Sequence, residues 1–210
     1  MSISNSVERR GSRRTHHIGW RQARNLWEAI HYADKRLVDI GRPLNTFATI
    51  NFGHIACSPE IVSAIFEKLR DNHFVRWLRY GRSELSHYVW VIENAGGNTH
   101  VHWVLHVPKS LQAAFGRKLE EWLARVAGPI TCRERAIKIQ PVPNLRGLGR
   151  YLLKGMDARY AARSGVKHVP QGLVYGKRCG VSKSLGPASR ARLSLGAPWR
   201  LHPAPTLLST

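Results

Sequence analysis

Two apolar segments joined by a short glycine-rich turn limit the folds available to this chain. Residues 86–93 (SHYVWVIE) and 99–107 (THVHWVLHV) are rich in β-branched and aromatic residues, and residues 94–98 (NAGGN) between them have a composition typical of tight turns. Two strands joined by so short a turn must be antiparallel, because a parallel pair needs a long crossover connection. The sequence therefore predicts a β-hairpin within a mainly antiparallel sheet.

Hydrophobic periodicity places helices on both sides of this hairpin in the sequence. Apolar residues at helical spacing predict a leading helix at 21–41 and later helices at 58–72, 109–128 and 145–165, and apolar β-branched runs predict further strands at 45–52 and 130–142. This order is typical of an α+β fold in which an antiparallel sheet carries its helices mainly on one face. The other face of the sheet is then free to hold polar side chains.

The length of 210 residues suits one domain with flanking extensions. We expect a basic N-terminal tail at 1–17, a folded domain with its leading helix at 18–165, and a basic C-terminal extension and tail at 166–210.

The charge balance indicates the class of partner. The chain carries 33 lysines and arginines against 13 aspartates and glutamates, a net charge of +20, on a sequence whose 43% hydrophobic content is that of a globular protein. Such a charge favours a polyanion, and nucleic acid is favoured over a membrane because no apolar run approaches about 20 residues. The three cysteines form no CxxC pair, which argues against a disulfide framework or a zinc ribbon. We expect a soluble, cytoplasmic protein that does not bind membranes.

Three histidines share one face of the second hairpin strand. Side chains alternate along a strand, so His100, His102 and His106 point to one side, opposite the apolar residues between them. Two histidines at i and i+2 stand roughly 6.6 Å apart and can converge on one divalent ion. Glu93, at the end of the preceding strand, is the expected third ligand, and such mixed nitrogen and oxygen ligands suit Mn²⁺ or Mg²⁺ at least as well as Zn²⁺. His106 is a candidate for an additional metal or phosphate contact, although an isolated pair of histidines in a strand is usually incidental.

A tyrosine and a lysine lie three residues apart on the predicted late helix. Tyr151 and Lys154 are then neighbours on one helix face, where the ammonium could favour a phenolate or bind a phosphate. The alternative is an amphipathic tyrosine at the core edge beside a solvated lysine. Tyr160 points to the opposite side and is a weaker candidate. Candidate DNA contacts are Arg76, Trp77, Arg79, Arg82 and Arg150.

The order of these motifs resembles a known family. Residues 46–52 (TFATINF), then Glu93 with residues 100–106 (HVHWVLH), then residues 151–154 (YLLK) resemble the rolling-circle replication initiators (Rep) of the HUH (His-hydrophobic-His) endonuclease superfamily, over about residues 45–160. The resemblance implies a ferredoxin- or RRM-like core, metal ligands at the two histidines and Glu93, a nucleophile at Tyr151 and a helper at Lys154. Residues 46–52 depart from the usual strand motif, so they are assigned no catalytic role.

The activity that the resemblance implies is metal-dependent, site-specific nicking and rejoining of single-stranded or locally melted DNA at the replication origin of a plasmid or phage, through a 5′-phosphotyrosine intermediate. A host or partner helicase and a polymerase would be needed, since no GxxxxGK[ST] motif is present. Two alternatives share this chemistry, a single-tyrosine transposase and a plasmid-mobilisation relaxase, the latter requiring His106 as a third histidine. A third alternative is a nucleic-acid-binding protein without catalytic activity.

Overall fold

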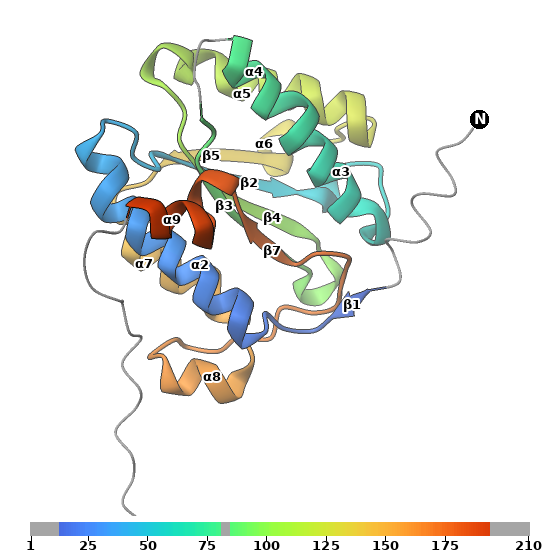
Figure 1. Ribbon diagram of the computed structural model, residues 1–210. Helices are drawn as coiled ribbons and strands as arrows, with labels where there is room; N and C mark the ends of the chain where they lie inside the picture. The colour runs from blue at the N-terminus through green and yellow to red at the C-terminus, as the bar shows by residue number, and fades with distance from the viewer. Residues whose placement is uncertain (1–12, 81–84, 194–210) are drawn as a thin grey trace, which may run out of the picture.

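A five-stranded antiparallel sheet forms the centre of the molecule (Figure 1). The computed structural model describes residues 13–80 and 85–193. The strands lie in the order β5 (Ile137–Pro141), β2 (Thr46–Asn51), β4 (His100–Leu105), β3 (Tyr88–Glu93) and β7 (Cys179–Val181), and each pair of neighbours is antiparallel. The predicted hairpin of β3 and β4 is confirmed, and so is the α+β class.

The hairpin turn depends on glycine. The turn η5 (Ala95–Gly97) holds Gly96 at φ 62° and Gly97 at φ 80°, a region that residues with a Cβ rarely adopt. The turn sets the register of the strands so that Glu93 lies opposite His100 and Val91 opposite His102.

Helical segments cover one face of the sheet, where α3 (Val62–Lys68), α4 (Val75–Tyr80) and α5 (Lys109–Ala127) lie together (Figure 1). The π-helical η4 (Leu69–Phe74) joins α3 to α4. The core on this side is aromatic, because Trp90 and Trp103 of the hairpin project into it and meet Phe66 and Phe74. Helix α5 ends at Gly128, whose φ of 98° breaks the helix as the sequence predicted.

Helices also cover much of the other face, so the prediction of helices mainly on one face was wrong. Helix α2 (Trp20–Tyr32), its π-helical continuation η1 (Ala33–Leu37), α7 (Leu145–Leu152) and α9 (Pro187–Leu193) lie on this side (Figure 1). The reason is in strand β3, where Val89 and Val91 alternate with Tyr88 and Trp90. Both faces of that strand are apolar, and both must be buried.

Several predicted segments have different bounds in the structure. The predicted helix at 145–165 is divided into α7, the 3-10 turn η6 (Leu153–Gly155) and α8 (Ala158–Arg163), with Asp157 capping the last. Within the predicted strand at 130–142, the short helix α6 (Arg133–Ala136) precedes β5. The remaining 3-10 turns are η2 (Phe52–His54), η3 (Pro59–Ile61) and η7 (Lys183–Leu185).

The segments predicted as flanking extensions contribute to the fold. Strand β1 (Arg14–Thr15) pairs with β6 (Val174–Tyr175), β7 is an edge strand of the main sheet, and Arg190 of α9 bonds Glu28 of α2 with an Nη2 to Oε2 distance of 2.8 Å. Residues 174–193 are therefore part of the folded domain, with β7 in the main sheet. In the described ranges, no helix combines the length and the apolarity needed to cross a membrane.

Candidate active site on the sheet

Polar side chains gather on the second face of the sheet around His102, where Tyr151 of α7 contacts it. As predicted from alternation, His100 and His102 lie on the side opposite Val101 and Trp103 of β4. Across the sheet, Thr49 of β2 is the register partner of His102, and Glu93 of β3 is the partner of His100. Strand pairing therefore brings these polar groups to one place on the sheet.

His102 is held from both sides of its ring. Its Nε2 lies 3.1 Å from Oε2 of Glu93, and its Nδ1 lies 3.2 Å from the hydroxyl oxygen of Thr49. With the proton on Nε2, the imidazole donates to Glu93 and the Thr49 hydroxyl donates to Nδ1. Both ring nitrogens are thereby satisfied in a side chain that is buried.

Thr49 is a site residue that the sequence analysis missed. It belongs to residues 46–52, to which no catalytic role was assigned, although its hydroxyl orients the ring of His102. Alternation along β2 was a signal that it shared a face with Phe47 and Asn51. The register of β2 against β4, which no local pattern predicts, decides that it meets His102.

Glu93 and Lys154 form a buried ion pair. The Nζ of Lys154 lies 2.9 Å from Oε2 of Glu93, and only 17% of the lysine side chain and 5% of the glutamate side chain are exposed. Burial raises the pKa of Glu93, but the hydrogen bonds from His102 and Lys154 outweigh it and bring the pKa below its ordinary value. Burial lowers the pKa of Lys154, but Tyr151 and Glu93 outweigh it and bring the pKa above its ordinary value. Both groups are therefore charged at neutral pH.

The ring of Tyr151 packs against the ammonium of Lys154, and its hydroxyl is directed at His102. The tyrosine oxygen is 3.4 Å from Nε2 of His102, the two rings meet edge to face with centroids 5.3 Å apart, and the Nζ of Lys154 is 3.7 Å from the centroid of the tyrosine ring. The predicted proximity of Tyr151 and Lys154 is confirmed, although Lys154 lies in η6 and not on α7. The tyrosine is 43% exposed, so a substrate in solution can reach its hydroxyl.

His100 lies beside this cluster, but its Nδ1 bonds the backbone and not Glu93. Its ring is parallel to that of His102 with centroids 6.2 Å apart, and its Nδ1 is 3.0 Å from the carbonyl oxygen of Asn98. Burial lowers the pKa of His100 and favours its neutral form, in which Nδ1 donates to Asn98 and Nε2 carries a free lone pair. Among the described residues, no group of three or more His, Cys, Asp or Glu side chains is arranged to hold a metal ion.

The other two predicted histidine and tyrosine candidates lie away from the cluster. His106 is four residues beyond His102, about 13 Å along extended chain, and its Nδ1 bonds the carbonyl oxygen of Pro43 at 2.7 Å. Tyr160 lies on α8, where its ring packs against Trp20 with centroids 5.3 Å apart. Neither residue contacts the Tyr151 hydroxyl in this arrangement.

The candidate DNA contacts are divided between two sides of the molecule. Arg76 and Arg79 are exposed on α4, which covers the opposite face of the sheet, and Trp77 packs there between Phe115 and Trp122. Arg82 lies outside the described residues. The structure does not bring this group to the Tyr151 cluster.

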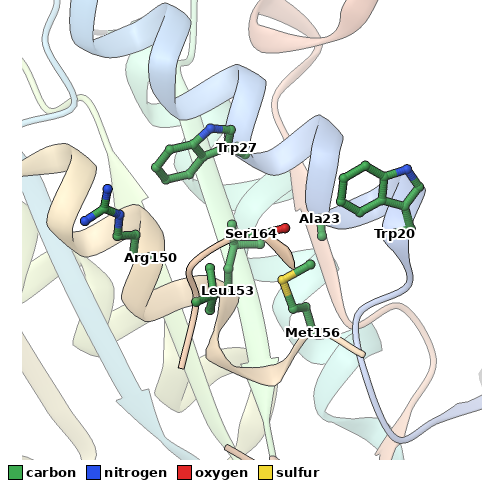
Figure 2. Close-up of a pocket in the computed structure, with 8 residues that line it drawn as sticks. Trp20, Ala23, Trp27, Arg150, Leu153, Met156 and Ser164 are labelled. Carbon is green, nitrogen blue, oxygen red and sulfur yellow. The ribbon is translucent and has the colours of Figure 1, made fainter. Parts of the chain in front are cut away.

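Arg150 is on the same side as Tyr151 but borders a different cavity. Figure 2 shows it with Trp27 and Leu153 around a small apolar pocket between α2 and the segment that follows α7. The side chain is exposed and adjacent in sequence to Tyr151. Its guanidinium therefore remains a candidate for a phosphate contact near the tyrosine.

Comparison of the chain with the known protein families finds no match, and comparison with curated protein sequences finds none either.

Proposed function

We propose that this protein is a metal-dependent, site-specific nickase and strand transferase of single-stranded DNA that initiates rolling-circle replication of a plasmid or phage. The observation that supports this most is the position of the Tyr151 hydroxyl, 3.4 Å from Nε2 of His102 and beside the ammonium of Lys154. The groups come from separate parts of the chain and meet at an exposed tyrosine. Such a constellation is typical of an activated nucleophile.

Each residue has a role in the proposed reaction that follows from its contacts. Lys154 places a positive charge beside the ring of Tyr151 and faces a phosphate oxygen as the substrate approaches. His102 orients the tyrosine hydroxyl, whose oxygen lies 3.4 Å from its Nε2. The tyrosine hydroxyl gives its proton to water and its oxygen attacks the phosphorus, the bond from phosphorus to O3′ breaks, and the leaving O3′ takes a proton from water. The products are a 5′-phosphotyrosine and a free 3′-hydroxyl, and the reverse reaction rejoins the strand without ATP.

The donors near Tyr151 fit a divalent ion chemically. His100, His102 and Glu93 would hold Mn²⁺ or Mg²⁺, and the second carboxylate oxygen of Glu93, Oε1, is buried and makes no hydrogen bond to a described residue. When bound, the ion would neutralise the charge that develops on the phosphoryl oxygens. In the tautomer with its proton on Nδ1, His102 donates a hydrogen bond to the hydroxyl oxygen of Thr49, and the lone pair of Nε2 is available to the ion.

The charge of the chain supports DNA as the substrate. A net charge of +20 attracts a polyanion at long range, and Arg150, exposed and next to Tyr151 in sequence, is a candidate cation for a phosphate of the bound strand. Strand separation and synthesis would come from a host or partner helicase and a polymerase. Among enzymes with this chemistry, a relaxase with three histidines is less favoured because His106 bonds Pro43 away from the cluster.

A covalent adduct tests the proposal directly. The purified chain is incubated with Mn²⁺ and 3′-labelled single-stranded oligonucleotides that tile the genetic element encoding it, and a denaturing gel is examined for labelled protein. We expect an adduct with the wild type and with Tyr160→Phe, and none with Tyr151→Phe, with the double variant His100→Ala and His102→Ala, or with EDTA.

The other outcomes identify what is wrong. An adduct that survives in Tyr151→Phe and is lost in Tyr160→Phe would move the nucleophile to Tyr160. Binding of the oligonucleotides without any adduct would favour the nucleic-acid-binding protein without catalytic activity.

A further inference from the structure

Arg178 is a buried cation directly behind the candidate site. Its side chain is 1% exposed, which places it among the most deeply buried large side chains of the protein. Its carbonyl oxygen accepts a hydrogen bond from the backbone N–H of Ile92 at 2.6 Å, so Arg178 lies beside the end of β3 that carries Glu93. In the sequence it stands in the segment assigned to a basic C-terminal extension.

The guanidinium of Arg178 is bound by neutral oxygens. Nε lies 3.2 Å from the hydroxyl oxygen of Thr15, and Nη2 donates to the carbonyl oxygens of Thr15, at 2.6 Å, and Gly172. Nη1 makes no hydrogen bond to any residue that the structure describes. A buried charge is costly unless an opposite charge compensates it. Burial lowers the pKa of Arg178, and Cys179 and then Glu93 oppose this effect.

The surroundings of Arg178 connect it to Lys154. A Cβ on Gly155, the residue after Lys154, would lie 3.9 Å from Nη1 of Arg178, so Nη1 faces the turn η6. The carbonyl oxygen of Lys154 accepts a hydrogen bond from the N–H of Val169 at 2.9 Å. The backbone of Lys154 is therefore attached to residues 169–172, which Arg178 binds at Gly172.

The same residues 169–172 connect Arg178 to Glu93. The N–H of Asn94 donates to the carbonyl oxygen of Gln171 at 2.8 Å, and Gly172 packs so closely that a Cβ would lie 2.0 Å from the carbonyl oxygen of Asn94. Arg178 thus binds residues 169–172, and this segment is hydrogen-bonded both to Lys154 and to Asn94, the residue after Glu93.

We propose that Arg178 is a positioning residue of the nicking reaction, which holds Glu93 and Lys154 in their working arrangement through residues 169–172 and through its charge. This rests on the proposed function. When Lys154 turns toward a phosphate, its contact with Oε2 of Glu93 weakens, and the buried charge of Arg178, whose backbone bonds Ile92 next to Glu93, then helps to keep the carboxylate ionised. Oε1 of Glu93 and Nη1 of Arg178 are the atoms of the two groups without a partner among the described residues.

A double-mutant cycle separates this role from simple support of the fold. The variants are Arg178→Gln, Glu93→Gln and their combination in the full chain, with Lys177→Gln as a matched control because Lys177 is the adjacent, exposed cation. The unfolding equilibrium constant is measured in urea with EDTA, and kcat and KM for adduct formation are measured with Mn²⁺.

We expect Arg178→Gln to lower kcat about tenfold with little change in KM, because the buried guanidinium cannot touch DNA. In the Glu93→Gln background its further effect on kcat and on the unfolding constant should be at least about fivefold smaller than alone, which is the sign of coupling. Lys177→Gln should leave kcat unchanged. Effects that multiply independently would overturn the proposal.

Arg178→Lys provides a second test that does not depend on the folding of Arg178→Gln. Lysine keeps the charge but cannot bridge Thr15 and Gly172 with a fork of donors. We expect kcat within about threefold of the wild type, together with lower stability. A loss of kcat of about tenfold or more would show that only the mechanical connection matters and would refute the role of the charge. If the wild type forms no adduct, the proposed function fails, whereas coupling in the unfolding constant still decides whether Arg178 acts on Glu93.

Discussion

Replacing Glu93 by alanine should destabilise the protein by several kcal/mol in the absence of metal. The carboxylate is buried, and its Oε2 contacts both the Nζ of Lys154 at 2.9 Å and Nε2 of His102 at 3.1 Å. Without it, an ammonium that is 17% exposed has no counter-ion at contact distance in the described cluster. Removal of one partner of a buried ion pair costs about 3 to 5 kcal/mol, and we expect a loss in that range.

Two companion variants show whether the loss comes from the uncompensated lysine. Glu93→Gln keeps the shape and one acceptor oxygen, so it should cost about 1 to 3 kcal/mol. Lys154→Met in the Glu93→Ala background removes the lysine ammonium that has lost its counter-ion. It should recover part of the lost stability, because burying an apolar side chain costs less than burying an unpaired ammonium.

Urea titrations with EDTA, followed by tryptophan fluorescence, measure these free energies of unfolding in full-length protein. A cost below about 1 kcal/mol for Glu93→Ala, or a double variant no more stable than Glu93→Ala alone, would refute the view that this ion pair is buried and mutually dependent.

Three further predictions concern the surroundings of the site. Gly172→Ala should cost at least about 2 kcal/mol, because its φ is +64° and a Cβ would lie 2.0 Å from the carbonyl oxygen of Asn94. The control Gly165→Ala, at φ +63° with open space around it, should cost only about 1 kcal/mol. Equal losses in urea titrations would contradict the close packing at Gly172. Burial, with the nearby charges of His106 and Arg42, lowers the pKa of His87 to about 4. Below about pH 6.5 the unfolded chain therefore binds a proton at His87 that the folded protein does not bind. This residue should lower stability by about 2 kcal/mol from about pH 7 to about pH 5, and His87→Gln should remove that contribution. His106→Asn should leave adduct formation within about twofold of the wild type, since its ring bonds a backbone carbonyl away from Tyr151; loss of the adduct would restore the three-histidine relaxase interpretation.

Local pattern was sufficient for the parts of this protein that depend on backbone periodicity. Alternation along residues 99–107 placed His100 and His102 on one face and Trp103 on the other, and the glycine-rich turn predicted the hairpin. The spacing of Tyr151 and Lys154 predicted that they are neighbours, and they are, even though the helix ends between them. These features depend on a few consecutive residues, and the sequence by itself determined them.

Tertiary structure decided which of these residues meet. The position of Tyr151 against His102 follows from the packing of α7 on α2, where Gly149 leaves room for Ile30, and the meeting of Thr49 with His102 follows from strand register. Helices cover both faces of the sheet because β3 is apolar on both sides, and β7 completes the sheet from a segment that local pattern assigned to an extension. Arg178 is buried because Thr15 and Gly172, which belong to other segments, pack around its guanidinium. Contacts between distant segments depend on how the whole chain buries its apolar surface, and no window of neighbouring residues contains that information.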